Sequence, residues 1–399
     1  MAGFIAALTL TCLFAAVCLR FVPLWIEAWS NKENGVLREE RIPAGTLAKI
    51  FFGVLLWDVF LVFLVTAVRF LAGEGISPDF WRCTDSQHYL DIAKDWYLSE
   101  GSIDRLVQLV FLPGYPIAVR FAQFVIGDYL TAGMAVSALC FAASACVFYK
   151  LLRLDTDGEK ALRALIFLCL FPGAFFFAAP MSESLFLLLS LTCVYMARKE
   201  KFLLSCLFGA LAAFTRSVGL ALLVPVLFEL VAQKKKLRSY LPLLLIPAGF
   251  GAYCLINYHV AGDAFKFMEY QREHWHQSFG LFFGTAAYQT DYALNADLRT
   301  LCGLWLPNLI ALFGAPVIML AGEGKMRTSY TAYFLAYYFV AMGATWLLSA
   351  PRYMLVMFPL YIAMGEIADT RCKKWLFFGI FAVMGLLYLI AFAMRWQVW

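Results

Sequence analysis

Long apolar runs recur along the whole 399-residue chain, and short polar segments separate most of them. Each run is about 16–27 residues long, and a helix of roughly 20 apolar residues spans the hydrocarbon core of a bilayer. Within that core, backbone N–H and C=O groups must bond to one another inside the segment. The pattern therefore predicts an all-α, polytopic transmembrane protein with about 11–13 membrane helices.

Composition excludes a soluble fold. The chain is 63% hydrophobic and only 15% charged, whereas soluble domains are roughly 45–50% apolar. The short loops leave no room for a separate soluble domain, so residues 1–399 are expected to form one transmembrane domain. Residues 3–27 have neither the basic start nor the small-residue cleavage site of a signal peptide, and we expect them to remain as the first span.

Basic residues cluster in six places between the apolar runs, which favours a topological role over nucleic-acid binding for the net charge of +5. Lys and Arg mark cytoplasmic loops. The six clusters are Lys32, Arg38 and Arg41; Lys150, Arg153, Lys160 and Arg163; Arg198, Lys199 and Lys201; Lys234 to Lys236 with Arg238; Lys325 and Arg327; and Arg371, Lys373 and Lys374.

Placing all six clusters inside predicts twelve spans and two large extracytoplasmic segments, residues 73–128 and 259–300. The spans are expected near 3–28, 46–72, 129–152, 161–179, 183–198, 202–216, 218–232, 240–258, 301–321, 329–349, 353–367 and 375–394. The two outer segments hold most of the Asp and all four His, so we expect the chemistry there. Nucleotides are not normally present on that face, and a synthetic reaction there needs an energy-bearing, membrane-borne substrate such as a lipid phosphate.

Two arginines lie at interruptions of the apolar pattern. The runs 202–216 and 218–232 are too short for an ordinary crossing, so their junction at Arg216 should lie below the outer surface. Arg352 follows Pro351 at a similar junction. A charge at that depth indicates either a functional site, here a phosphate site, or an Arg that pairs with an acid or reaches the interface.

The first outer segment contains a predicted surface helix. Apolar residues in the stretch 81–98 follow a helical spacing, and Thr84 with Gln87 has the spacing of a capping box. Asp85 would then lie in the first turn with His88 one turn later on the same face. Asp85 is either the base that takes a proton from an acceptor hydroxyl or an acid that only complements the helix dipole. Asp91 and Asp95 would continue this polar stripe.

Five motifs in order resemble one known family. They are Asp85-Ser86-Gln87-His88-Tyr89 with Ile92-Ala93; Phe111-Leu112-Pro113-Gly114-Tyr115-Pro116; Phe171-Pro172-Gly173-Ala174-Phe175-Phe176-Phe177 with Ser182-Glu183-Ser184-Leu185-Phe186; Thr215-Arg216-Ser217-Val218-Gly219; and Pro351-Arg352-Tyr353 with Phe358-Pro359. Together they resemble PIG-V-type mannosyltransferases, the second mannosyltransferase of GPI-anchor synthesis and its prokaryotic relatives. Thr84 and Gly114 depart from the family, which has Trp and Leu there.

The resemblance implies a GT-C membrane fold and a mannosyltransferase-like, inverting transfer of a hexose from a polyprenyl- or dolichyl-phosphate donor to a lipid or glycan acceptor. It implies Asp85 as the catalytic residue. No cofactor is implied, and a divalent metal is not expected. From the motifs and the outer position of their residues we expect substrate binding by His88, Tyr89, Tyr115, Glu183, Arg216, Arg352 and Tyr353. For Glu183, at the outer start of a span, the alternative is an acid that only complements the first turn of its helix.

Other polar residues give weaker signals. His259, His274 and His276 with Asp263 and Glu273 suggest a metal site, but His274 and His276 are two residues apart and would point to different faces of a helix. An aromatic gate for donor or acceptor around Tyr270, Trp275 and Phe279 is the alternative. Cys83 and Cys302 are the one pair placed near the outer face that could form a disulfide. Asp58 lies mid-span, where it would pair with Arg20 or Arg69 or belong to a proton path.

The rival function is a membrane transporter or flippase, because interrupted spans with charges also mark transport sites. That class predicts inverted repeats, and we find none in the sequence. A noncatalytic membrane scaffold would leave the polar chemistry of the outer segments unexplained. The expected partners are membrane lipids, the donor and the acceptor, and no nucleic acid. The expected location is a bacterial plasma membrane, or the endoplasmic reticulum membrane in a eukaryote, with the site on the extracytoplasmic or lumenal side.

Overall fold

The computed structural model describes residues 1–31, 42–97 and 107–398. In these residues the chain is helical, and the only β-type pairing is an isolated antiparallel bridge between Phe279 and Ala344. The all-α prediction is confirmed. The basic residues Lys32, Arg38 and Arg41 lie outside the described residues.

Six helices are long and apolar enough to cross a membrane: Ala2–Ser30, Ala44–Leu71, Tyr129–Leu152, Leu237–Ala261, Leu298–Lys325 and Arg371–Ala393. They correspond to α1 (Ala2–Asn31), α2 (Ala44–Leu71), α6 (Tyr129–Leu152), η5 with α11 (Leu237–Leu244 and Leu245–Ala261), α14, η6, α15 and η7 (Leu298–Thr300, Leu301–Trp305, Leu306–Gly322 and Glu323–Lys325), and α19 (Arg371–Ala393). The prediction of an integral multi-pass membrane protein is therefore confirmed.

The remaining predicted spans are shorter helices. They are α7 (Gly158–Leu170), α8 (Glu183–Arg198), α9 (Phe202–Thr215), η4 with α10 (Ser217–Leu222 and Leu223–Ala232), α16 (Thr328–Met342), α17 (Ala350–Leu355) and α18 (Phe358–Ile367). The break at Arg216 separates α9 from η4, as expected from the short runs. The predicted span 161–179 is interrupted, because α7 ends at Leu170 and the 3-10 turn η3 (Ala174–Phe177) follows Gly173, whose φ of 107° favours glycine.

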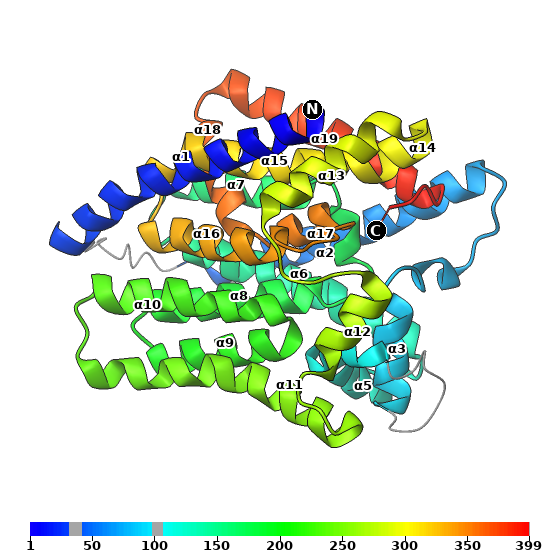
Figure 1. The fold of residues 1–399 in the computed structure, drawn as a ribbon, viewed down its shortest axis with the longest axis horizontal. Helices are drawn as coiled ribbons and strands as arrows, with labels where there is room; N and C mark the ends of the chain where they lie inside the picture. The colour runs from blue at the N-terminus through cyan, green and yellow to red at the C-terminus, as the bar shows by residue number, and fades with distance from the viewer. Residues whose placement is uncertain (32–41, 98–106, 399) are drawn as a thin grey trace.

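The helices form a bundle with short helices gathered at one end (Figure 1). In that view α8, α9, α10 and α11 lie side by side across the molecule. The two predicted outer segments supply the short helices α3 (Ser86–Asp95), α5 (Gly114–Ile126), α12 (Lys266–Trp275) and α13 (Phe282–Asn295), with the turns η1 (Pro78–Trp81) and η2 (Val107–Val110). We call the end that carries α3, α5 and α12 the α3 end.

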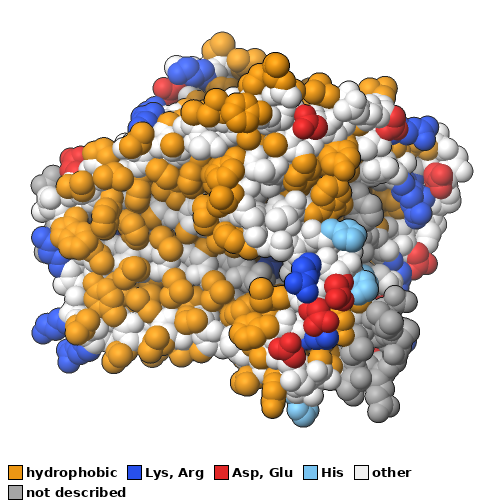
Figure 2. Space-filling model, viewed as in Figure 1, with side chains coloured by type: hydrophobic (Ala, Val, Ile, Leu, Met, Phe, Trp, Pro, Cys, Tyr) orange, Lys and Arg blue, Asp and Glu red, His pale blue; other side chains and the backbone are white. Residues whose placement is uncertain are grey.

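The surface has the pattern of a membrane protein. Figure 2 shows hydrophobic side chains covering the sides of the helices on this face, while Lys, Arg, Asp and Glu gather mainly toward the two ends. Phe52, Leu56 and Phe63 on α2 are 61%, 68% and 63% exposed. Exposed apolar side chains along a helix face are stable where lipid, rather than water, surrounds them.

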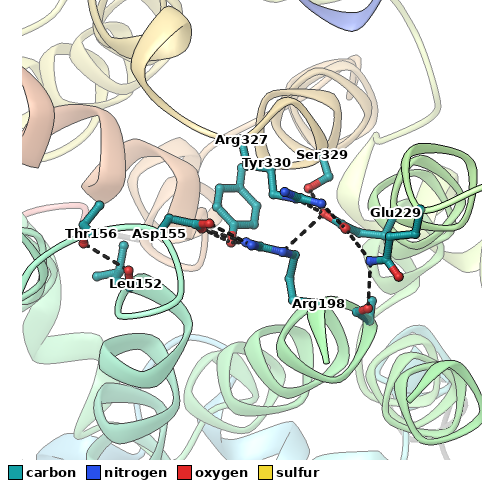
Figure 3. A network of polar contacts seen from close by, with 10 residues as sticks. Leu152, Asp155, Thr156, Arg198, Glu229, Arg327, Ser329 and Tyr330 are labelled. Carbon is teal, nitrogen blue, oxygen red and sulfur yellow. Dashed lines mark hydrogen bonds and ion pairs between the residues drawn. The ribbon is translucent and has the colours of Figure 1, made fainter. Parts of the chain in front are cut away.

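A polar network ties helices together at the end of the bundle opposite the α3 end. Figure 3 shows its contacts from close by. Arg198, at the end of α8, donates to both carboxylate oxygens of Asp155 at 2.6 and 2.7 Å. Its Nε lies 3.7 Å from Oε1 of Glu229 on α10. Arg327 donates to both oxygens of Glu229 at 2.6 and 2.8 Å, and Tyr330 on α16 donates to Asp155 at 3.0 Å. The two Arg and two acids compensate one another, which permits their burial.

The predicted pairing of Asp58 is wrong. Arg20 lies 3.2 Å from Glu323, and Arg69 lies 3.2 Å from Glu74. Asp58 is 2% exposed, and its Oδ1 has no hydrogen-bond partner among the described residues. Arg20 of α1 pairs with an acid of η7 far along the chain, and Arg69 pairs with one just beyond its own helix; the positions of the charges in the sequence do not reveal these choices.

Candidate active site

Asp85 lies at the start of α3, in the first predicted outer segment. It is the N-cap residue, but its side chain makes no capping hydrogen bond. The predicted capping box is absent, because Thr84 Oγ1 faces Met181 Sδ at 3.8 Å and Gln87 donates to Asp91 at 2.6 Å. The Asp85 carboxylate is therefore free of the helix backbone and points elsewhere.

The backbone just before Asp85 is strained. Thr84 has φ of 50°, in the left-handed region that β-branched residues rarely adopt. Such conformations persist where the surrounding structure imposes them, and they cluster at functional sites. Here the turn at Thr84 removes this residue from the N-cap position and directs the next side chain toward α17.

The partner of Asp85 is Arg352 on α17. Arg352 Nη1 lies 2.9 Å from Asp85 Oδ2. The Asp85 side chain is 32% exposed, whereas that of Arg352 is 6% exposed. The pair thus joins the first outer segment to the last quarter of the chain, with its carboxylate on the accessible side.

Glu183, the first residue of α8, is the centre of the site. Its Oε1 accepts from Arg352 Nη2 at 2.7 Å and Nε at 3.0 Å, and Arg216 Nη1 lies 2.8 Å from the same oxygen. The Glu183 side chain has no exposed surface, and its Oε2 has no hydrogen-bond partner among the described residues. One buried carboxylate therefore holds two guanidinium groups together. The two negative charges of Asp85 and Glu183 balance the two positive charges of Arg216 and Arg352.

Tyr89 and Tyr353 complete the surroundings of Arg216. The hydroxyl groups of Tyr89 and Ser182 are 2.9 Å apart, and Arg216 Nη1 donates to Ser182 Oγ at 3.1 Å. The Arg216 guanidinium carbon lies 5.4 Å from the centre of the Tyr353 ring, within cation–π range. Burial raises the pKa of Tyr89 well above its usual value, so its hydroxyl stays protonated and acts as a hydrogen-bonding group.

Two motif glycines allow the close packing that places Arg216. A Cβ added to Gly114 at the start of α5 would lie 2.9 Å from the Cα of Thr215, and one added to Gly219 would lie 2.5 Å from the backbone N of Ala213. Real Cβ atoms do not approach other atoms so closely. The departure from Leu at Gly114 thus has a local reason, because α5 here touches the backbone next to Arg216.

The other two predicted substrate-binding residues lie apart from this ion cluster. His88 stacks on Phe111 with ring centroids 4.7 Å apart, and the Trp275 ring of α12 lies 6.4 Å from His88. Tyr115 is completely buried, and its hydroxyl donates to Gly133 O at 2.8 Å within α6. His88 therefore belongs to an aromatic wall beside the site, and Tyr115 supports the packing of α5 on α6.

The loop that leads into Arg352 is fastened by residues that sequence reasoning missed. Buried Asn308 of α15 donates to Leu348 O at 3.2 Å and accepts from the backbone N of Ala350 at 2.8 Å. From α13, Gln289 donates to Leu347 O at 2.8 Å. No motif marks Asn308 or Gln289. The motif predicts no separate role for Ser182, although this residue stands next to Glu183 in the sequence.

The structure also places the predicted cysteine pair and the predicted aromatic gate. Cys83 and Cys302 are both free. Burial raises the pKa of Cys83 to about 11, so this thiol is protonated at neutral pH and is a weak nucleophile and metal ligand. Trp275 stands beside His88, as described above, whereas Phe279 pairs with the loop before α17 through its bridge to Ala344.

Comparison with known families identifies the region that holds most of this site. Residues 79–246 match the model of the family described as mannosyltransferase (PIG-V). No curated protein matches the chain. The matched segment contains Asp85, Glu183 and Arg216, while Arg352 lies beyond it and is brought to Asp85 by the fold. The match supports a glycosyltransferase of the mannosyltransferase type. The resemblance predicted from the motifs is thus confirmed, and the chain is a multi-pass membrane protein whose residues 79–246 match the mannosyltransferase (PIG-V) family.

Proposed function

We propose that the chain transfers a hexose, most simply mannose, from a lipid-phosphate carrier to a hydroxyl of a lipid or glycan acceptor. One observation carries the proposal: an accessible carboxylate, Asp85, lies 2.9 Å from the guanidinium of Arg352, which shares the buried Glu183 with Arg216. This places a proton acceptor next to groups suited to a phosphate. A membrane-embedded site of this kind fits a donor that is itself anchored in the bilayer.

The proposed reaction is a single displacement. Asp85 accepts the proton of the acceptor hydroxyl while that oxygen forms a bond to the anomeric carbon of the donor sugar. The bond between this carbon and the phosphate oxygen breaks, and the carrier phosphate leaves with the electron pair. Attack from the face opposite the leaving group inverts the anomeric configuration. Arg352 and Arg216 stabilise the negative charge that develops on the leaving phosphate.

The resting ion pairs suggest how the site is prepared. Asp85 Oδ2 is occupied by Arg352 Nη1, while Arg352 Nε and Nη2 are held by Glu183. Nη1 carries two N–H groups, and a donor phosphate that accepts from the one facing Asp85 would displace this carboxylate. Donor binding would then free Asp85 for the acceptor, and Glu183 would keep Arg352 in place during this exchange.

The expected membrane face follows from the basic residues. Three lysines lie at the end of the bundle opposite the α3 end. Lys150 is in the last turn of α6, Lys160 is near the start of α7, and Lys199 directly follows α8. Lys and Arg are enriched in cytoplasmic loops. We therefore place the site on the extracytoplasmic or lumenal side, where the donor is a polyprenyl- or dolichyl-phosphate sugar and the acceptor a glycolipid or glycan.

The test is transfer of radiolabelled mannose from polyprenyl-phosphate mannose to a lipid extract by the purified protein in proteoliposomes. Asp85→Asn is compared with Asp91→Asn, which alters a carboxylate on the same helix that only accepts from Gln87 in the described contacts. We expect D85N to lose at least about 100-fold in rate, because general base catalysis contributes about 10²–10⁴-fold. D91N should retain activity. Movement of the lipid-linked sugar across the bilayer without any product would instead support a flippase.

A further inference from the structure

A groove separate from the candidate active site opens on the side of the bundle between α2, α6 and α7. It has a volume of about 520 Å³, and its walls are mostly apolar, including Ile50, Val54, Trp57, Leu162 and Ile166. Trp57 Nε1 donates to Cys169 O at 3.0 Å, which fixes the indole ring across the groove. At Gly53 a Cβ would meet no atom within 4 Å, so the groove is open along α2 at this position.

The groove lies at the end of the helices opposite the α3 end. Tyr149 near the end of α6 and Gly158 at the start of α7 line it. On α6 the Tyr115 hydroxyl contacts Gly133 O and Ser137 Oγ, and Gly133 lies near the beginning of this helix. Sixteen residues of helix, roughly 24 Å, separate Gly133 from Tyr149. The groove is therefore not part of the site around Asp85.

The mouth of the groove carries positive charge that the described residues do not neutralise. Lys49 lines the groove and is exposed. Lys150 lies one turn beyond Cys146, whose Sγ contacts Leu47 O on α2 at 3.4 Å. Among the described residues no carboxylate pairs with either lysine, whereas Lys160 lies 3.3 Å from Glu366 and Lys374 lies 3.6 Å from Glu159. An apolar track with a basic mouth is complementary to a chain with an anionic head.

We propose that this groove binds an anionic glycerophospholipid, with one acyl chain along Gly53 and Trp57 and the phosphate near Lys49 and Lys150. Basic pockets between transmembrane helices bind anionic lipid head groups in this way. The proposal does not depend on the reaction at Asp85, because the two places share no residues.

The experiment measures lipid binding to the delipidated full-length protein in detergent by native mass spectrometry. The probes are phosphatidylglycerol and phosphatidylcholine with identical acyl chains. We expect phosphatidylglycerol to bind roughly tenfold more tightly, since each basic residue near the head group favours an anionic lipid. Lys49→Glu should abolish this preference. Lys236→Glu changes an exposed lysine beyond α10 that is not among the residues lining this groove, and it serves as the matched control.

A second pair of variants tests the acyl-chain track. Gly53→Trp places a large side chain where there is open space, so we expect it to weaken the binding of both lipids without unfolding the protein. Gly379→Trp makes the same change on exposed α19, where a Cβ also meets nothing within 4 Å. Equal binding of the two lipids to the wild type, or an equal effect of G53W and G379W, would overturn the proposal. Size-exclusion profiles of the variants separate a filled groove from a misfolded protein.

Discussion

At the scale of single residues, Arg352 has the most demanding geometry in the site. Its Nη1 pairs with Asp85 while Nε and Nη2 both donate to Glu183. A lysine has one ammonium group and cannot hold both carboxylates in this fixed arrangement. We expect Arg352→Lys to lower kcat/KM for the donor by at least about 30-fold, since charge-assisted bonds to a leaving phosphate contribute about 2 kcal/mol or more.

The control for Arg352→Lys is Arg82→Lys, because Arg82 pairs only with exposed Asp79 in the described contacts. Initial rates at several donor concentrations separate donor binding from turnover. If Arg352→Lys stayed within threefold of the wild type, about 0.65 kcal/mol, the assignment of Arg352 to the phosphate would be wrong.

Glu183 should matter for folding as well as for transfer. Glu183→Gln keeps the shape of the side chain but leaves Arg216 and Arg352 with only the charge of Asp85. Removing one partner from a buried ion cluster costs about 3–5 kcal/mol, so the unfolding temperature in detergent should fall markedly. Glu74→Gln removes an exposed carboxylate that pairs with Arg69 and should change the unfolding temperature little.

The double variant Glu183→Gln with Arg216→Gln restores neutrality. Failure to recover any stability would show that charge balance is not the cause.

At the scale of elements, the short helix α17 depends on a buried amide. Asn308 bonds to Leu348 O and to the N of Ala350 on either side of the helix start. Asn308→Ala leaves these backbone groups without partners at a cost of about 1–3 kcal/mol. Because α17 carries Arg352, we expect kcat to fall several-fold with little change in the donor KM.

Two variants make the Asn308 prediction specific. Asn308→Asp keeps an acceptor for Ala350 but not a donor for Leu348, so its kcat should be intermediate. Asn295→Ala removes an amide that bonds only within its own helix, to Asp291 O, and should be silent. A loss of kcat in Asn308→Ala that matched its loss of folded protein would indicate a purely structural role.

Local patterns predicted the elements better than the contacts between them. The short runs around Arg216 correctly indicated a break, because helix length is set by apolar run length. The capping box failed at Thr84 because the left-handed backbone there depends on tertiary packing, which spacing does not reveal. Asp85, Glu183 and Arg216 could be named from their motifs. The bonds between Glu183 and Arg352, 169 residues apart, could not.

At the scale of the whole molecule, α8 connects two ion networks. Glu183 begins this helix at the candidate active site, and Arg198 ends it in the network of Figure 3. Fifteen helical steps place them about 22 Å apart. Both networks balance two acids against two arginines, so each fixes one end of α8.

This separation predicts that the distant network supports folding without taking part in transfer. Asp155→Asn removes the carboxylate that accepts hydrogen bonds from both Nη atoms of Arg198, and the Arg198 side chain is 1% exposed. We expect a loss of about 2–3 kcal/mol, less than for a fully buried pair because the Asp155 side chain is 26% exposed. Below the unfolding temperature, kcat/KM should stay within about twofold of the wild type, a change of roughly 0.4 kcal/mol. Asp369→Asn, in an exposed pair with Lys373, is the control for both measurements. A loss of transfer in Asp155→Asn as large as that in Glu183→Gln would instead mean that α8 transmits a conformational change between the two ends of the bundle.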